Sequence, residues 1–200
     1  MAIKLASIFF TMILVDNYVL AKFLGICPFL GVSKKLDSAV GMSLAVTFVM
    51  VMATAATWPL YMGILAPNGL EYLQTIVFIL VIAILVQLLE NFLKKFIPAL
   101  YKSLGVYLPL ITTNCTILGV TILNLDNGYS FPESIVCAAG AGIGFLVAMV
   151  LFSGVRRKVE QAIVPECFKG LPITLVAAAM TSLSFMGFGG IVENLFNVTL

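Results

Sequence analysis

Residues 27–32 have the sequence Cys-Pro-Phe-Leu-Gly-Val, and residues 115–120 have the sequence Cys-Thr-Ile-Leu-Gly-Val. The two stretches share the pattern Cys-x-x-Leu-Gly-Val, and the similarity continues through the segment that follows each of them. The further matches are Leu36-Asp37 with Leu125-Asp126, and Ala39, Gly41, Met50 and Val51 with Ala138, Gly140, Met149 and Val150. The matches occur in the same order, so the sequence predicts two repeats, at about 1–98 and about 99–200.

The composition is that of a membrane protein. Hydrophobic residues make up 62% of the 200 residues and charged residues only 10%, whereas soluble domains are about 45–50% apolar and about 25% charged. One span needs about 20 apolar residues, and the sequence offers six such segments. They are roughly 5–26, 38–63, 72–92, 103–123, 134–155 and 171–192. We therefore predict an all-α integral membrane protein in which residues 1–200 form a single transmembrane domain without room for a soluble module.

Basic residues indicate the orientation of these six spans. Nine of the eleven Lys and Arg residues fall in the first, third and fifth loops, and none falls in the second or fourth. The nine are Lys34, Lys35, Lys94, Lys95, Lys102, Arg156, Arg157, Lys158 and Lys169. Positively charged loops remain in the cytoplasm, so loops 1, 3 and 5 are predicted to be cytoplasmic and both termini to lie outside.

Three spans per repeat predict an inverted topology, because an odd number makes the second half enter the membrane from the opposite side. Proteins of this kind place their working site near the middle of the membrane, on interrupted helices. Pro28 disfavours helical backbone at Cys27, and Pro109 removes a backbone donor shortly before the polar run Thr112-Thr113-Asn114. Both Cys-bearing segments are therefore expected to be broken, and to face the protein interior or a partner.

Cys27 and Cys115 are the candidate metal ligands, because the repeat pairs them at the two breaks. Cys137 and Cys167 are expected to be a small buried residue and a reduced cytoplasmic thiol. The chain has no histidine, and two thiolates fall short of the four ligands of a structural zinc or a [2Fe–2S] cluster. Two further ligands must then come from a second copy or a related chain. An iron–sulfur cluster would make the pair a redox centre at a subunit interface. Inert cysteines and a disulfide remain alternatives.

The first hydrophobic stretch also contains Asp16, Asn17 and Lys22. An ionised side chain at the bilayer centre costs about 2.5–3.5 kcal/mol, so such residues usually face a cavity or a partner. One hypothesis is that Lys22 offsets the charge of a thiolate-ligated cluster and that Asp16 contributes to an ion path. The alternative is that these two residues pair with each other or cap a half-helix. Asn114, directly before Cys115, is a further candidate for the surroundings of the site.

Several of these motifs closely resemble one family of membrane subunits. They are Asn17-Tyr18-Val19-Leu20, Lys22-Phe23-Leu24-Gly25-Ile26-Cys27-Pro28-Phe29 with Gly31-Val32-Ser33-Lys34-Lys35, Leu110-Ile111-Thr112-Thr113-Asn114-Cys115, and Phe185-Met186-Gly187-Phe188. The family contains the A subunit of the Rnf complex and the E subunit of the sodium-pumping NADH:quinone oxidoreductase. Cys-Pro-Phe at residues 27–29 is more similar to the Rnf branch.

The resemblance implies six spans in two inverted halves, in a bacterial or archaeal cytoplasmic (inner) membrane. It implies a [2Fe–2S] cluster shared with a homologous sister subunit, to which Cys27 and Cys115 contribute two ligands. It also implies a complex that transfers electrons between ferredoxin and NAD and couples this to Na⁺ or H⁺ translocation. A secondary transporter with inverted repeats is one alternative, and a structural membrane subunit with inert cysteines is another.

Overall fold

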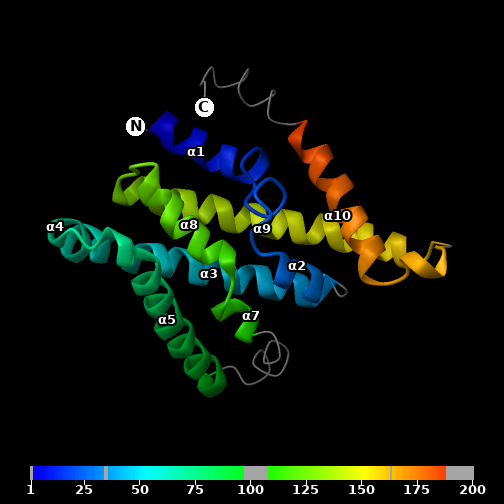
Figure 1. Ribbon diagram of the computed structural model, residues 1–200, viewed down its shortest axis with the longest axis horizontal. Coiled ribbons are helices and arrows are strands. Elements are labelled where there is room, and N and C mark those ends of the chain that lie inside the picture. Colours follow the sequence, from blue (N-terminus) through cyan, green and yellow to red (C-terminus); the bar gives the residue numbers. More distant parts are fainter. Residues whose placement is uncertain (1, 34–35, 97–107, 163, 188–200) are drawn as a thin grey trace.

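The computed structural model describes residues 2–33, 36–96, 108–162 and 164–187 (Figure 1). This described part is helical and contains no strand. Its helices are α1 (Ala2–Leu14), α2 (Ile26–Val32), α3 (Leu36–Leu60), α4 (Ala66–Asn68), α5 (Gln74–Phe96), α7 (Leu108–Thr112), α8 (Cys115–Asp126), α9 (Phe131–Glu160) and α10 (Leu171–Met186). Short turns of other helix types lie at Tyr61–Leu65, Glu71–Leu73 and Glu166–Phe168.

Three helical segments are long and apolar enough to cross a membrane, namely Leu36–Asn68, Gln74–Phe92 and Phe131–Glu160. Shorter apolar helices lie at Lys4–Leu14, Leu110–Asp126 and Leu171–Met186. The prediction of an all-helical membrane protein is confirmed at this level. Parts of the expected spans and loops lie outside the described residues, namely 97–107 with Lys102, residues 188–192, and Lys34 and Lys35.

Both Cys-bearing segments are interrupted, but the prolines do not cause the interruptions. Cys27 already lies inside α2, and Pro28 occupies the first turn of that helix. Pro109 likewise lies in the first turn of α7. The first amides of a helix have no intrahelical partner, so a proline there sacrifices no hydrogen bond. The expectation that Pro28 distorts the helix at Cys27 is therefore wrong, and each proline helps a helix to begin.

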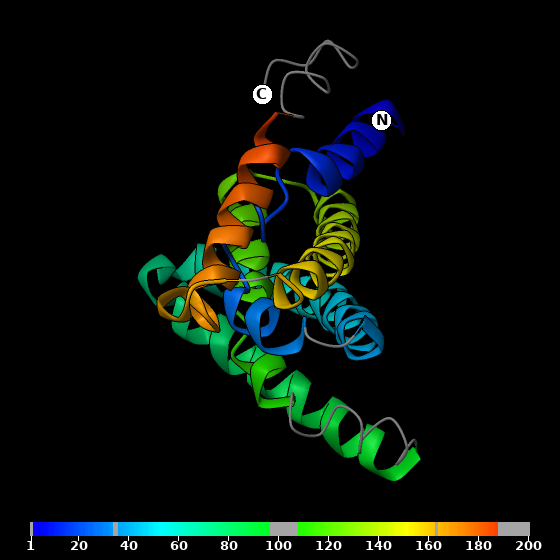
Figure 2. The same ribbon diagram turned by 90° about the vertical axis from the view of Figure 1, so that its right-hand side faces the viewer.

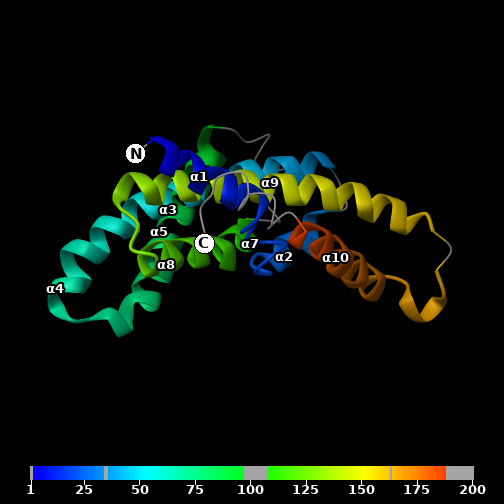
Figure 3. The same ribbon diagram turned by 90° about the horizontal axis from the view of Figure 1, so that it is seen from above.

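Helices α3 and α9 form the central pair of the fold and run antiparallel to each other (Figure 1). Helix α1 packs on α9 and α8 packs on α3, while α10 packs on α9 and α5 on α3. The broken segment of each predicted repeat thus packs against the long helix of the other, α1 against α9 and α8 against α3. Figure 3 shows α2 and α10 lying beside each other, whereas Figure 2 shows that α5 projects away from the other helices.

Glycines on α9 permit the close approach of its neighbours. A Cβ at Gly144 would lie 2.9 Å from the carbonyl oxygen of Met12, and a Cβ at Gly140 would lie 3.1 Å from that of Phe9. Gly142 points to α3, where a Cβ would come within 2.5 Å of Thr47. The small residues therefore allow the backbones of α1 and α3 to approach α9 closely from different sides.

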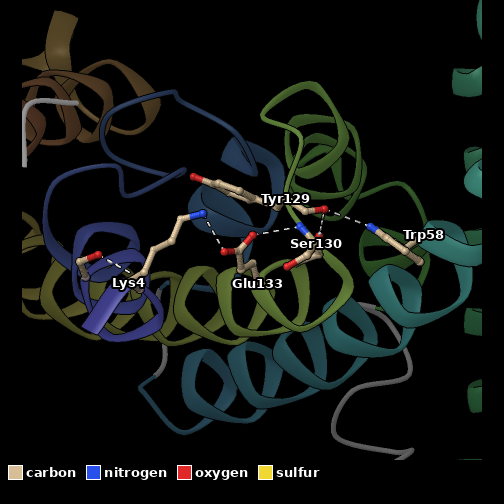
Figure 4. A network of polar contacts seen from close by, with 7 residues as sticks. Lys4, Trp58, Tyr129, Ser130 and Glu133 are labelled. Carbon is tan, nitrogen blue, oxygen red and sulfur yellow. Dashed lines mark hydrogen bonds and ion pairs between the residues drawn. The ribbon is translucent and has the colours of Figure 1, made fainter. Parts of the chain in front are cut away.

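A polar network fixes the start of α9 (Figure 4). Ser130 and Glu133 form a capping box in which the Ser130 backbone N–H donates to Glu133 Oε2 at 3.0 Å. Glu133 Oε1 also pairs with Lys4 Nζ of α1 at 2.8 Å. Trp58 of α3 donates from Nε1 to the Tyr129 carbonyl at 3.1 Å. Helix α1 is thus joined to the first turn of α9, and α3 to the turn that precedes it.

Candidate functional site

The first break, residues 15–25, is organised by Asn17, whose side chain is buried. Its Nδ2 donates to the Gly144 carbonyl at 2.8 Å and to the Ile13 carbonyl at 3.3 Å. Its Oδ1 accepts from the backbone N–H groups of Val19 and Leu20 at 3.1 and 3.4 Å. One amide side chain therefore replaces several helical hydrogen bonds and joins the break to α9, which meets the need of buried backbone groups for partners.

The second break is much shorter and consists of residues 113 and 114. Asn114 is the N-cap of α8, and its Oδ1 accepts from the Thr116 N–H at 3.1 Å. Such a cap satisfies one of the unpaired amides at the helix start. The Nδ2 group of Asn114 is buried and makes no hydrogen bond to the described residues. Asn114, a predicted site residue, therefore determines where the helix carrying Cys115 begins.

The two breaks contact each other at Gly25 and Cys115. The Gly25 N–H donates to the Cys115 sulfur at 2.9 Å. Gly25 has a φ of 79°, and a Cβ there would lie only 2.2 Å from Thr116 Oγ1. A residue with a side chain could neither adopt this backbone easily nor fit against Thr116. The structure thus places the backbone two residues before Cys27 directly against the sulfur of Cys115.

The four cysteines differ in exposure. Cys27 and Cys115 are exposed, although the backbone that carries each of them is packed against the other break. Cys115 is the first residue of α8 and Cys27 the second of α2. Cys137 is fully buried, as expected, and Cys167 is exposed in the turn Glu166–Phe168.

The residues present fit one half of a four-thiolate site. The two exposed thiols come from adjacent breaks, and the described residues contain no group of three or more His, Cys, Asp or Glu side chains able to hold a metal. A [2Fe–2S] cluster needs four protein ligands. Cys27 and Cys115 could supply two of them only where another chain supplies the remaining two.

Asp16 and Lys22 lie in the first break and pair with each other. The Lys22 Nζ is 3.8 Å from Asp16 Oδ1, and it also lies 5.0 Å from the centre of the Tyr18 ring. Both side chains are about one third exposed. This geometry agrees with the alternative in which the two charges compensate each other. It leaves the hypotheses of an ion path at Asp16 and of an electrostatic role for Lys22 as proposals.

Arg156 has a structural role that the sequence analysis missed. Its side chain is buried at the end of α9, where Nη1 donates to the Leu30 carbonyl and to Ser33 Oγ. Arg156 therefore caps the end of α2, the helix that carries Cys27. A signal existed, because Arg156 lies three and four residues after Ser153 and Phe152, on the face of α9 that is buried. The expected role in topology applies better to Arg157 and Lys158, which are exposed.

Comparison with known proteins agrees with this arrangement. The family model described as "Rnf-Nqr subunit, membrane protein" matches residues 5–192. The chain belongs to the Rnf-Nqr family. Cys27, Cys115 and both interrupted segments lie inside the matched region.

Several curated relatives within the Rnf-Nqr family are about half identical to the chain. The A subunit of an ion-translocating oxidoreductase complex from Syntrophotalea carbinolica is 55% identical over 90% of this chain and 93% of its own length. The A subunit of a Na⁺-translocating ferredoxin:NAD⁺ oxidoreductase complex from Acetobacterium woodii is 53% identical over 93% and 97%. The A subunit of an ion-translocating oxidoreductase complex from Aliivibrio salmonicida is 51% identical over 90% and 94%. The chain is thus similar to these three proteins over nearly its whole length.

Proposed function

We propose that this chain is the A-type membrane subunit of an ion-translocating ferredoxin:NAD⁺ oxidoreductase complex. It relays electrons through a [2Fe–2S] cluster whose ligands it shares with a homologous sister subunit. Support comes from the names of relatives that are 50–55% identical along most of the chain. The chain contributes to a redox-driven translocase without carrying a complete active site itself.

The contact between Gly25 N–H and the Cys115 sulfur carries the cluster proposal. It brings together two segments that are far apart in sequence, and each of them bears an exposed cysteine. Inert packing cysteines would be expected to lie buried, as Cys137 does. Cys27 and Cys115 would hold one side of the cluster, which when bound accepts and donates single electrons. The N–H of Gly25 would stabilise negative charge on the Cys115 sulfur.

An inverted topology gives this half-site its place in the membrane. We infer six spans, of which α3 and α9 are the second and fifth, with loops 1, 3 and 5 in the cytoplasm of a cell with a cytoplasmic (inner) membrane. The antiparallel direction of α3 and α9 and the reciprocal packing of α1 on α9 and α8 on α3 support it. In this arrangement the two breaks enter from opposite faces and meet at the centre.

Metal analysis of the purified complex tests the cluster assignment. Iron, acid-labile sulfide and the electron paramagnetic resonance signal are measured for Cys27→Ala, Cys115→Ala and the matched control Cys167→Ala. Each of the first two changes should remove the iron of one [2Fe–2S] cluster and its signal, because two thiolates from one chain are needed. Cys167→Ala should change neither. An unchanged iron content and signal in both site variants would refute the relay.

A further inference from the structure

A cavity is formed by the end of α2, the end of α9 and the start of α10. It has a volume of about 580 Å³, and its charged lining residues are Arg156, Glu160 and Lys169. The rest of its wall is mostly apolar and includes Leu30, Val159 and Leu171. The residues that line it include neither the two candidate ligand cysteines nor the Asp16–Lys22 pair. The cavity thus combines cations with an apolar wall at a distance from the proposed cluster ligands.

Arg156 gives the cavity a fixed cation. The side chain is 7% exposed, and its Nη1 and Nε groups are held by Leu30, Ser33 and Glu160. Its Nη2 group makes no hydrogen bond to the described residues, which leaves donors of the planar guanidinium for a ligand. An arginine immobilised in this way binds phosphate with little further loss of side-chain entropy.

Two further features add positive potential to the same wall. Lys169 lines the cavity, and its exposed pair with Glu166 at 3.7 Å is too weak to prevent other partners. Gly170, Leu171 and Thr174 also line it, and they belong to the cap and first turn of the 16-residue helix α10. The start of such a helix carries unpaired N–H groups and a partial positive charge. Glu160 pairs with Arg156 at 3.3 Å, so the cavity lining contains two cations and one carboxylate.

A small apolar cavity of about 70 Å³ lies between α2 and α10. It shares Leu30 with the charged cavity, and its other lining residues include Ile26, Leu175 and Ala179. Leu175, Met180 and Leu183 on α10 are at least half exposed. A ligand with an anionic head and an apolar tail would match both parts.

We propose that the cavity binds the phosphate of an anionic phospholipid, with an acyl chain along the exposed apolar residues of α10. The last turns of α9, beside the cavity, contain Arg156-Arg157-Lys158. Such a basic run is typical of the cytoplasmic membrane surface, where anionic headgroups lie. The lipid would bridge the helix carrying Cys27 to the last described helix of the second repeat. The inference rests on the proposed membrane orientation and is independent of the cluster.

Photo-crosslinking in proteoliposomes containing the whole complex tests the proposal. Phosphatidylglycerol with a photoreactive headgroup is compared with the corresponding phosphatidylcholine, and labelled peptides are mapped by mass spectrometry. We expect phosphatidylglycerol to label residues 156–174. Lys169→Gln should reduce this labelling about fivefold, because it removes a cation that lines the cavity, where a charge-assisted hydrogen bond to phosphate contributes about 1 kcal/mol or more. The matched control Lys158→Gln removes an exposed lysine outside the cavity and should leave the labelling unchanged.

The other outcomes would overturn the proposal. Equal reductions in both lysine variants would indicate general surface attraction without a site, and equal labelling by the two lipids would show no requirement for an anionic head. Displacement of the label by inorganic phosphate alone would indicate a phosphate site that needs no acyl chain. Absence of label in residues 156–174 would mean that another protein of the complex covers this face. The iron content of the same samples shows separately whether the proposed function holds.

Discussion

The two interrupted segments are stabilised by different kinds of contact. The first break runs from residue 15 to 25 and depends on contacts with the other repeat, because Asn17 bonds to Gly144 of α9 and Gly25 packs against Thr116 of α8. The second break has only residues 113 and 114, and Asn114 caps the helix that follows it. Each leads into a helix that bears an exposed cysteine.

This difference predicts that the first break is more sensitive to substitution than the second. The helix after the second break, α8, spans Cys115–Asp126 and has its own N-cap. The helix after the first break, α2, has seven residues and begins at a glycine without a side-chain cap. Isolated helices of that length are unstable in water. Changes in the first break should therefore cost more free energy of unfolding than corresponding changes in the second.

Gly25→Ala should have the largest effect. The substitution places a Cβ 2.2 Å from Thr116 Oγ1 in a backbone conformation with φ of 79°. Left-handed backbone costs a residue with a side chain about 1–2 kcal/mol, and overpacking adds about 1–3 kcal/mol. We expect the free energy of unfolding in detergent to fall by about 2–5 kcal/mol.

Gly128→Ala is the matched control for that experiment. Gly128 also has a positive φ, of 65°, but a Cβ there would have no atom within 4 Å. It should cost only the backbone share, about 1–2 kcal/mol. Equal losses in the two variants would show that the contact between the breaks contributes nothing.

The paired substitutions Asn17→Ala and Asn114→Ala compare the two breaks directly. Asn17 makes four hydrogen bonds, one of them to α9, whereas Asn114 accepts one from Thr116. We expect a loss of about 2–4 kcal/mol for Asn17→Ala, because buried backbone groups lose their partners. Loss of the cap at Asn114 should cost about 1 kcal/mol. Denaturant unfolding of both variants measures the difference. A greater loss for Asn114→Ala would contradict the prediction that the first break is the more sensitive one.

Arg156→Gln tests the other end of α2. The charged hydrogen bonds from Nη1 to the Leu30 carbonyl and Ser33 Oγ would be lost, at a cost of about 2–3 kcal/mol. Helix α8 needs no such partner, since its C-cap Asn127 bonds back to its own carbonyls. The neighbouring exposed Arg157→Gln should change stability by no more than about 0.5 kcal/mol. Similar melting curves for the two variants would contradict a capping role for Arg156.

The sequence predicts an all-helical membrane protein correctly, because hydrophobicity and length are properties of each segment alone. It also predicts that the Cys-bearing segments are broken, but it assigns the first break to Pro28 when Asn17 and Gly25 make it. The reason is that both residues act through long-range partners, Gly144 and Thr116, which no local pattern reveals. Helical spacing indicates that Arg156 is buried, but it does not reveal the capping role, because the partner Leu30 lies on another helix. The proposed pairing of Cys27 with Cys115 is different, because it is predicted from the sequence repeat, which relates segments far apart in the chain.

Lys22→Gln should have the smallest effect on stability. The pair of Lys22 with Asp16 is about one third exposed and 3.8 Å long, so its loss should lower the free energy of unfolding by less than about 1 kcal/mol. The second break has no corresponding ion pair among the described residues. If Lys22 also offsets negative charge at the proposed cluster, its removal should make the midpoint potential more negative, because the reduced cluster carries the additional electron. A redox titration followed by electron paramagnetic resonance, with Lys158→Gln as control, measures this shift. An unchanged potential would restrict Lys22 to its pairing with Asp16 and its contact with Tyr18, and the asymmetry between the breaks would then be structural alone.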